Sequence, residues 1–281
     1  MKPYAPLTDK KLFLLDMDGT IYLGDNLFDG TVDFLNYVKA QGGRYVFLTN
    51  NSSRGIEGYL QKMERLGIPA KEEDFLTSTD ATIRYLKNTY RPEDKFYVCG
   101  TENFKMQLKN AGLFVADEPL FGAHIEEARS SEFKAVVLAY DTEVTYKKLE
   151  DCAVLLRDPK VDYVATHPDM VCPTPYGSAP DIGCYIDTLF TCTGRKPVVI
   201  GKPQPEMAYM AMEKFGCTKE QTCIMGDRLY TDIACGVNAG IDAIFVLSGE
   251  GVMSDIEKYK VEPSYIFPGI RNVLDELQKK G

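Results

Sequence analysis

The sequence predicts an α/β fold with a largely parallel sheet and an inserted second domain. Short apolar runs alternate with amphipathic helical stretches along almost the whole chain, which is the order that builds α/β folds. The runs are nearly continuous in Val, Ile, Leu and Phe, a composition typical of strands that are covered on both faces. The strands that end in chemically active residues lie near the two ends of the chain, and this indicates a core domain interrupted by an insert.

Eight apolar runs predict strands: LFLLD (12–16), RYVFLT (44–49), KFYVCG (95–100), KAVVLA (134–139), DYVAT (162–166), PVVIG (197–201), TCIMGD (222–227) and DAIFVL (242–247). Helical patterns cover 31–43, 54–67 and 271–280. Gly42 and Gly43 are a plausible C-terminal stop for the first helix. The middle of the chain has a strand–helix alternation of its own. We therefore expect a core domain from residues 1–78 and 195–281, and an inserted α/β domain from 79–194.

Composition and charge exclude several classes of protein. Of the 281 residues, 44% are hydrophobic and 26% charged, which is typical of folded globular chains. No apolar run approaches the ~18 residues of a membrane span, so no membrane partner is expected. The first ten residues, MKPYAPLTDK, lack an apolar signal core, and we expect a cytoplasmic protein. The net charge of −9 argues against a nucleic-acid partner.

Cysteine and histidine usage limits the metal sites that the chain can form. The eight cysteines contain no CxxC pair, and their mostly apolar surroundings favour reduced thiols. His124 and His167 are the only histidines, which excludes a multi-histidine metal site.

Two carboxylates follow the first predicted strand directly. Asp16 ends the apolar run, and Asp18 lies two residues later in a glycine-containing turn. In open α/β sheets the ligand crevice lies beyond the carboxyl ends of the strands. There Asp16 can act as a nucleophile toward phosphorus, and Asp18 can exchange protons with the leaving oxygen and with water. The alternatives are a pair of solvated turn carboxylates and an EF-hand loop, which fits poorly because its twelfth position is Leu27.

Two further strand ends carry groups suited to binding phosphate. Thr49 and Asn50 end the second strand, and a hydroxyl with nearby backbone N–H groups can hold phosphate oxygens. Ser52 or Ser53 would then cap the next helix, and an ordinary cap and turn is the alternative. Lys202 follows PVVIG and can neutralise crowded negative charge. A solvated lysine is the alternative, whereas a P-loop is excluded because Pro203 occupies the Ser/Thr position.

The fourth strand end is the segment GDRLYTD. Asp227 ends an apolar strand, and Asp232 follows in the first turn of the predicted helix. A few carboxylates together with phosphate are a magnesium pattern. Asp232 can also stabilise the start of the helix.

With DMDGT, LTNNSS, GKP and GDRLYTD in this order, the sequence resembles the haloacid dehalogenase superfamily of aspartate-nucleophile phosphotransferases. More narrowly it is similar to the NagD-like group, which includes 4-nitrophenyl phosphatases. The resemblance implies a Rossmann-like core and an insert of the type II α/β cap class. It implies Asp16 as nucleophile and Asp18 as general acid/base, with Thr49 and Lys202 on the phosphate. Magnesium would be held by Asp16, the Asp18 backbone carbonyl and Asp227, with Asp232 in support.

The loop 165–187 is the most unusual part of the insert. NagD-like relatives carry a TNPD segment here that faces the active site, whereas this chain has Thr166-His167-Pro168-Asp169. It also has PDIG at 180–183, where many relatives carry a PG turn. We expect His167 and Asp169 to contribute to substrate specificity, although a lone histidine is more often structural.

These features predict a magnesium-dependent phosphatase that hydrolyses phosphomonoesters of small metabolites through an aspartyl-phosphate. A phosphomutase or phosphotransferase of the same superfamily is one alternative, and a non-catalytic, metabolite-binding regulatory relative is another. A metal-free dehalogenase is disfavoured by Asp227 and Asp232. Phosphoglycolate, sugar phosphates, nucleotides and pyridoxal phosphate are all compatible substrates. Some relatives form a homodimer through the cap, and the sequence leaves this open here.

Overall fold

The computed structural model describes residues 6–116, 132–174 and 177–279. His124 lies outside the described residues. The chain divides into two compact units. Unit 1 comprises Met1–Thr49, Ile56–Leu76 and Lys202–Gly281, and unit 2 comprises Asn50–Gly55 and Thr77–Gly201. The predicted domain boundaries near Ser78 and Gly194 remain predictions, and the contact-based division passes from unit 2 to unit 1 after Gly201.

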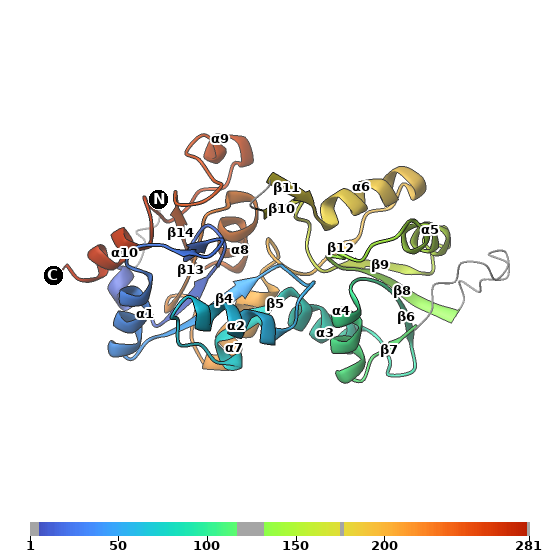
Figure 1. Ribbon diagram of the computed structural model, residues 1–281, viewed down its shortest axis with the longest axis horizontal. Helices are drawn as coiled ribbons and strands as arrows, with labels where there is room; N and C mark the ends of the chain where they lie inside the picture. Colours follow the sequence, from blue (N-terminus) through green and yellow to red (C-terminus); the bar gives the residue numbers. More distant parts are fainter. Residues whose placement is uncertain (1–5, 117–131, 175–176, 280–281) are drawn as a thin grey trace. The chain divides into compact units, whose positions relative to one another are not determined.

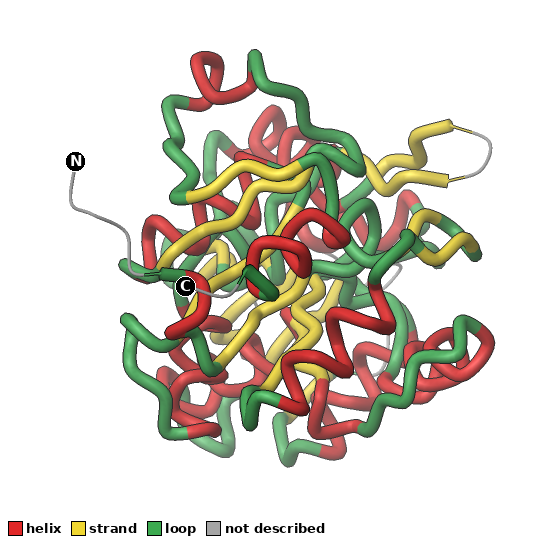
Figure 2. The backbone as a smooth tube through the Cα atoms, turned by 90° about the vertical axis from the view of Figure 1, so that its left-hand side faces the viewer, coloured by secondary structure: helices red, strands yellow, loops and turns green. Residues whose placement is uncertain are grey.

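Unit 1 is built on a six-stranded sheet with the strand order β15-β14-β13-β1-β4-β5. Figure 2 shows the backbone with strands in yellow and the helices that flank them in red. The strands are β1 (Leu12–Leu15), β4 (Arg44–Thr49), β5 (Phe75–Thr77), β13 (Thr222–Gly226), β14 (Asp242–Val246) and β15 (Tyr265–Phe267). The helices are α1 (Thr31–Ala40), α2 (Ile56–Arg65), α7 (Glu206–Phe215), α8 (Ala234–Ala239), α9 (Asp255–Tyr259) and α10 (Ile270–Leu277), labelled in Figure 1. A short hairpin, β2 (Tyr22–Leu23) and β3 (Asn26–Leu27), follows β1.

The central strand β1 lies where the order of the sheet reverses. It pairs in parallel with β13 on one side and with β4 on the other. Leu15 is in register with Met225 and with Phe47. The residues that follow these three strands therefore emerge at one edge of the sheet, where α/β folds bind their ligands.

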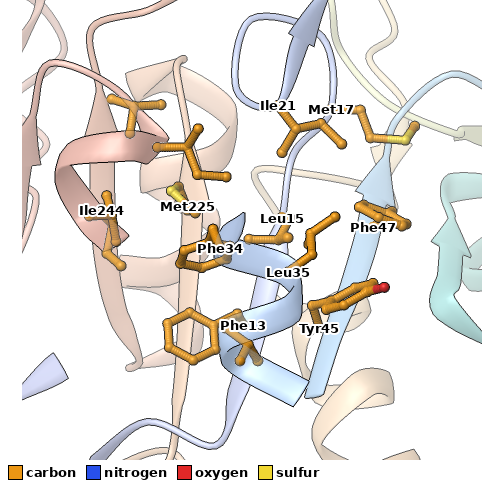
Figure 3. Close-up of a cluster of buried hydrophobic side chains, with 14 of the residues drawn as sticks. Phe13, Leu15, Met17, Ile21, Phe34, Leu35, Tyr45, Phe47, Met225 and Ile244 are labelled. Carbon is orange, nitrogen blue, oxygen red and sulfur yellow. The ribbon is translucent and has the colours of Figure 1, made fainter. Parts of the chain in front are cut away.

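Buried apolar side chains hold this edge in place. Phe13 and Leu15 of β1 pack with Phe34 of α1 and with Met225 of β13 (Figure 3). The rings of Phe13 and Phe34 meet edge to face, with centroids 5.4 Å apart. All four residues of β1 are buried, and full burial of one such side chain contributes about 1.5–3 kcal/mol. Packing on both faces makes β1 a rigid support for the residues after it.

Unit 2 is built on a second parallel sheet with the strand order β12-β9-β8-β6-β7. The strands are β6 (Lys95–Cys99), β7 (Phe114–Val115), β8 (Phe133–Leu138), β9 (Asp162–Ala165) and β12 (Val198–Val199). The helices are α3 (Ser78–Thr89), α4 (Glu102–Asn110), α5 (Tyr146–Leu155) and α6 (Ile182–Thr193), and β10 (Val171–Thr174) with β11 (Gly177–Pro180) forms a hairpin. Its core includes Tyr97, Leu138, Cys152, Tyr163 and Leu189.

The predicted α/β class with parallel sheets is confirmed. Differences concern short elements: β12 keeps only two residues of the predicted run 197–201, and Val198 is half exposed. The strands β5 and β15 have three residues each, too few for a periodic pattern in the sequence. All eight cysteines are free thiols, four of them buried. In the part of the chain that the structure describes, no helix is both long and apolar enough to cross a membrane.

Candidate active site

Lys202 joins two of the predicted acidic residues in unit 1. Its Nζ lies 2.6 Å from Asp16 Oδ1 and 2.6 Å from Asp232 Oδ1. It also donates to the carbonyl oxygen of Leu48, at 3.3 Å, one residue before Thr49 at the tip of β4. The side chain of Lys202 is only 3% exposed. The ends of β1 and β4 are therefore tied to Lys202 by direct polar contacts.

Thr20 links Asp16 to Asp227. Its hydroxyl donates to Asp16 Oδ2 at 3.5 Å and can also donate to Asp227 Oδ1 at 3.4 Å. Asp16, Asp227 and Asp232 each place a carboxylate oxygen within 4.8 Å of the others. Oxygen atoms of clustered carboxylates are the ligands that hard divalent cations prefer. This acidic cluster can hold a metal ion.

Burial and mutual repulsion raise the pKa of two carboxyl groups in the cluster. Burial, followed by the charges of Asp16 and Asp232, raises the pKa of Asp227 to about 8. Burial and the charge of Asp16 raise the pKa of Asp232 to about 6, although Lys202 opposes the shift. For Lys202 itself, burial lowers the pKa, but the charges of Asp16 and Asp232 outweigh it and the net pKa rises. One ammonium group does not neutralise three carboxylates, and a divalent cation would supply the missing charge.

Asp18 lies apart from this buried group. Its side chain is 54% exposed, and its Oδ1 lies 3.4 Å from the Nζ of Lys62 on α2. Lys62 is held in turn over the ring of Tyr22, at 3.7 Å from the ring centroid. Partial burial raises the pKa of Asp18, Lys62 lowers it, and the charge of Asp16 raises it further, so that the net pKa is above its usual value. A carboxyl with a raised pKa is suited to proton transfer near neutral pH.

The loop after β14 supports Asp227, a contact that was not predicted from the sequence. The backbone N–H of Glu250 donates to Asp227 Oδ2 at 2.7 Å, and the N–H of Gly251 donates to the Asp227 carbonyl at 3.1 Å. Ser248 Oγ donates to the carbonyl oxygen of Gly19 at 2.7 Å. The side chain of Glu250 is held by Arg228, at 2.9 Å. The segment Ser248–Gly251 thereby connects the turn after β1 to the end of β13.

Close packing explains the glycines in these two loops. Gly19 has a φ of +89°, which favours glycine, and a Cβ there would lie 2.4 Å from Asp227 Oδ2. A Cβ on Gly249 would lie 2.0 Å from the same oxygen. The available signal in the sequence was the pair of glycines in LSGEG after an apolar strand, a pattern that marks a close backbone approach.

The remaining candidates lie in unit 2. The side-chain amide of Asn50 donates to Asp169, with Nδ2 3.1 Å from Oδ1 and 3.4 Å from Oδ2. His167 is fully buried, with Nδ1 3.7 Å from Asp169 Oδ2 and Nε2 3.8 Å from Asp181 Oδ1. Asp181, from the PDIG segment, begins α6 by accepting the N–H of Ile182 at 2.6 Å. Asn50, His167 and Asp169 therefore form one buried group with Asp181.

The structure thus distributes the predicted residues over two groups. Asp16, Lys202, Asp227 and Asp232 lie together in unit 1, with Thr49 at the adjacent strand end. Asn50, His167 and Asp169 lie together in unit 2. Ser52 was predicted, as an alternative to Ser53, to cap the next helix, which begins four residues later at Ile56. Its Oγ accepts the N–H of Tyr140 at 3.0 Å and pairs with the hydroxyl of Thr166 at 3.1 Å.

Comparison with known sequences identifies the family. A profile of haloacid dehalogenase-like hydrolases matches residues 13–114, and a HAD-hydrolase-like profile matches residues 199–273. An acid sugar phosphatase from Staphylococcus aureus (strain USA300) is 31% identical over 269 residues, which cover 96% of this chain and 98% of that protein. The chain belongs to the haloacid dehalogenase-like hydrolase family.

Solved structures of the same family resemble the chain over nearly its full length. The 4-nitrophenylphosphatase from Thermotoga maritima matches with a TM-score of 0.86 and 36% identity, covering 97% of this chain and 99% of that one. A glycerol phosphate phosphatase from Mycobacterium tuberculosis, in complex with magnesium, matches with a TM-score of 0.85 and 27% identity, over 99% of this chain and 79% of that one. The predicted resemblance to 4-nitrophenyl phosphatases of this superfamily is confirmed.

Proposed function

We propose that this haloacid dehalogenase-like hydrolase is a magnesium-dependent phosphatase that hydrolyses phosphomonoesters of small metabolites through an aspartyl-phosphate on Asp16. The observation that carries the proposal is the position of Lys202, whose ammonium group contacts both Asp16 and Asp232. A buried cation at that point neutralises the repulsion that a phosphate dianion would otherwise meet from the carboxylates. The relatives named above are phosphatases of a sugar phosphate, an aryl phosphate or glycerol phosphate.

The residues of unit 1 fit a resident magnesium ion. Asp16 and Asp227 would hold it with the backbone carbonyl of Asp18, and Asp232 would support the site through Lys202. Burial, together with the charges of Asp16 and Asp232, raises the pKa of Asp227 to about 8, and a bound cation would favour its carboxylate form. When bound, the ion would act as a Lewis acid that stabilises charge on the phosphoryl oxygens.

The chain's own residues account for the proton and bond changes. A carboxylate oxygen of Asp16 forms a bond to phosphorus while the ester oxygen leaves, and Asp18 gives that oxygen its proton. Water then attacks phosphorus, Asp18 takes the proton from the water, and the bond to Asp16 breaks to release inorganic phosphate. Lys202, with the Thr49 hydroxyl and the backbone N–H of Asn50, would hold the phosphoryl oxygens throughout.

The predicted alternatives differ in their products. The experiment is to incubate the purified protein with magnesium and 4-nitrophenyl phosphate, then with a panel of phosphorylated metabolites, and to measure released inorganic phosphate. A phosphatase releases one phosphate per product alcohol. A phosphomutase would return the phosphoryl group to another hydroxyl of its sugar, with little free phosphate. A non-catalytic relative would show no turnover, and that result would contradict the proposal.

A further inference from the structure

The segment Thr166–Asp169 follows β9 and contacts a residue next to a proposed phosphate ligand. Its Asp169 carboxylate accepts the side-chain N–H groups of Asn50, at 3.1 and 3.4 Å. Asn50 is joined by a peptide bond to Thr49, the last residue of β4. Asp169 therefore fixes the side chain of Asn50, the residue that directly follows Thr49 in the chain.

Thr166, at the other end of the segment, is bound to the chain that leads to Lys202. Its carbonyl oxygen accepts the N–H of Gly201 at 2.7 Å, and Gly201 immediately precedes Lys202. Its hydroxyl pairs with Ser52 Oγ at 3.1 Å, and Ser52 belongs to the same piece of unit 2 as Asn50. One four-residue segment thus holds the unit 2 residues that directly adjoin Thr49 and Lys202 in the chain.

Packing leaves little freedom where the chain leaves unit 2. A Cβ on Gly201 would lie 2.6 Å from the Thr166 carbonyl oxygen and 2.7 Å from Asn50 Oδ1. Ser78, two residues after Leu76 of unit 1, donates its hydroxyl to the carbonyl oxygen of Asn50 at 2.5 Å. Asn50, Ser78 and Gly201 are therefore packed together in unit 2, next to three of the four points where the chain passes between the units, 49/50, 76/77 and 201/202.

Further buried contacts fix the position of Asp169. Its backbone N–H donates to His167 Nδ1 at 3.4 Å, and the other ring nitrogen lies 3.8 Å from Asp181 Oδ1. Asp181 is anchored at the start of α6 by the N–H of Ile182. The four side chains Asn50, Asp169, His167 and Asp181 are all buried. Side chains held in such a network keep a single orientation, which a positioning group requires.

We infer that Asp169, together with Thr166, is a positioning residue that sets the backbone leading into the phosphate-binding residues Thr49 and Lys202. The inference rests on the proposed function, since that function assigns phosphate binding to Thr49 and Lys202. It differs from the specificity role predicted for this loop. A leaving-group contact affects only the substrates that carry that group. A positioning residue affects every substrate alike, because all of them present the same phosphoryl group.

The test compares variants of the full-length protein with magnesium present. The substrates are 4-nitrophenyl phosphate and the best metabolite from the panel, and inorganic phosphate serves as product inhibitor. Asp169→Ala should lower kcat/KM for both substrates by the same factor, about tenfold or more, and should raise the Ki of inorganic phosphate similarly. Asp169→Asn keeps one oxygen acceptor for Asn50 and should change each value less than about threefold. Asp187→Ala replaces an exposed acid on α6 and is the matched control. It should change neither kcat/KM for the two substrates nor the Ki of inorganic phosphate.

A double-mutant cycle isolates the contact itself. In an Asn50→Ala background, Asp169→Ala should have little additional effect, because the partner of the hydrogen bond is already gone. Thr166→Val removes the hydroxyl paired with Ser52 without changing the side-chain volume much, and should lower kcat/KM for both substrates equally. It provides the same test if Asp169→Ala fails to fold.

The outcomes separate the inference from the function it rests on. Additive effects in the cycle, an unchanged Ki for phosphate, or a loss confined to the metabolite would overturn the positioning role. A wild-type protein without turnover contradicts the proposed function instead. An active wild type with the predicted uniform losses in the variants supports both.

Discussion

Replacement of Lys202 by methionine tests the charge balance of the site. The change keeps most of the side-chain volume and removes an ammonium group that lies 2.6 Å from two carboxylate oxygens. Removal of one partner from a buried ion pair costs about 3–5 kcal/mol, because the other charge stays buried without compensation. Loss of the same cation from a transferring phosphoryl group should reduce kcat/KM about 10³-fold, equivalent to about 4 kcal/mol.

The stability of this variant should depend on pH in a defined direction. In the wild type the folded-state pKa of Asp232 is already raised to about 6, and loss of Lys202 would raise it further. A carboxyl with a raised folded-state pKa binds its proton more tightly folded than unfolded, so the fold gains stability as the pH falls. The deficit of Lys202→Met should therefore be large at pH 8 and smaller at pH 5.

Urea denaturation, monitored by circular dichroism in the presence of chelator, measures the loss of folding stability. Turnover of 4-nitrophenyl phosphate measures the activity. Lys219→Met removes an exposed lysine of unit 1 and serves as the control. Activity of Lys202→Met within tenfold of the wild type, or a stability deficit that grows toward pH 5, would contradict this role of the Lys202 ammonium group.

Four other predictions concern the same site. Asp18→Asn should lower kcat by about 10²–10⁴-fold while phosphate still inhibits competitively, because proton transfer is lost and binding is kept; an unchanged kcat in steady-state assays would exclude Asp18 as the acid. Gly249→Ala should lower kcat/KM by about 10²-fold, because its Cβ would lie 2.0 Å from Asp227 Oδ2; wild-type kinetics would show that the loop does not position Asp227. Chelator should abolish turnover and magnesium should restore it, with calcium less effective. Magnesium should raise the melting temperature more at pH 8 than at pH 5. The carboxyl of Asp227, with a pKa of about 8, holds a proton at low pH that the ion must displace. An equal rise in melting temperature at both pH values would argue against metal binding at Asp227.

Much of the candidate site was predictable because its signals are local. An apolar strand followed at once by a polar residue marks a strand end, and parallel strands bring such ends to one edge. Asp16, Lys202 and Asp227 were found in this way. The resemblance of the four motifs to the haloacid dehalogenase superfamily supplied the catalytic and binding roles, which the spacing of the residues alone could not assign.

The parts that escaped prediction depend on contacts between distant residues. Lys62 reaches Asp18 across 44 positions of the chain, and Asn50 reaches Asp169 across 119. No local pattern reports such pairings. Glu250 supports Asp227 through its backbone N–H, which every residue except proline carries, so residue type gave no clue. In β5 and β15, three residues are too few to show a period of two.

Nucleophilic catalysis by Asp16 is tested most directly by the turnover of 4-nitrophenyl phosphate, with magnesium, by the wild type and by Asp16→Asn. The amide has nearly the same shape as the carboxylate, but it is a poor nucleophile and no longer an anionic ligand. Circular dichroism should show that the variant is folded. The wild type should hydrolyse the substrate, and folded Asp16→Asn should show no turnover above background. Turnover by Asp16→Asn near the wild-type rate would contradict nucleophilic catalysis by Asp16.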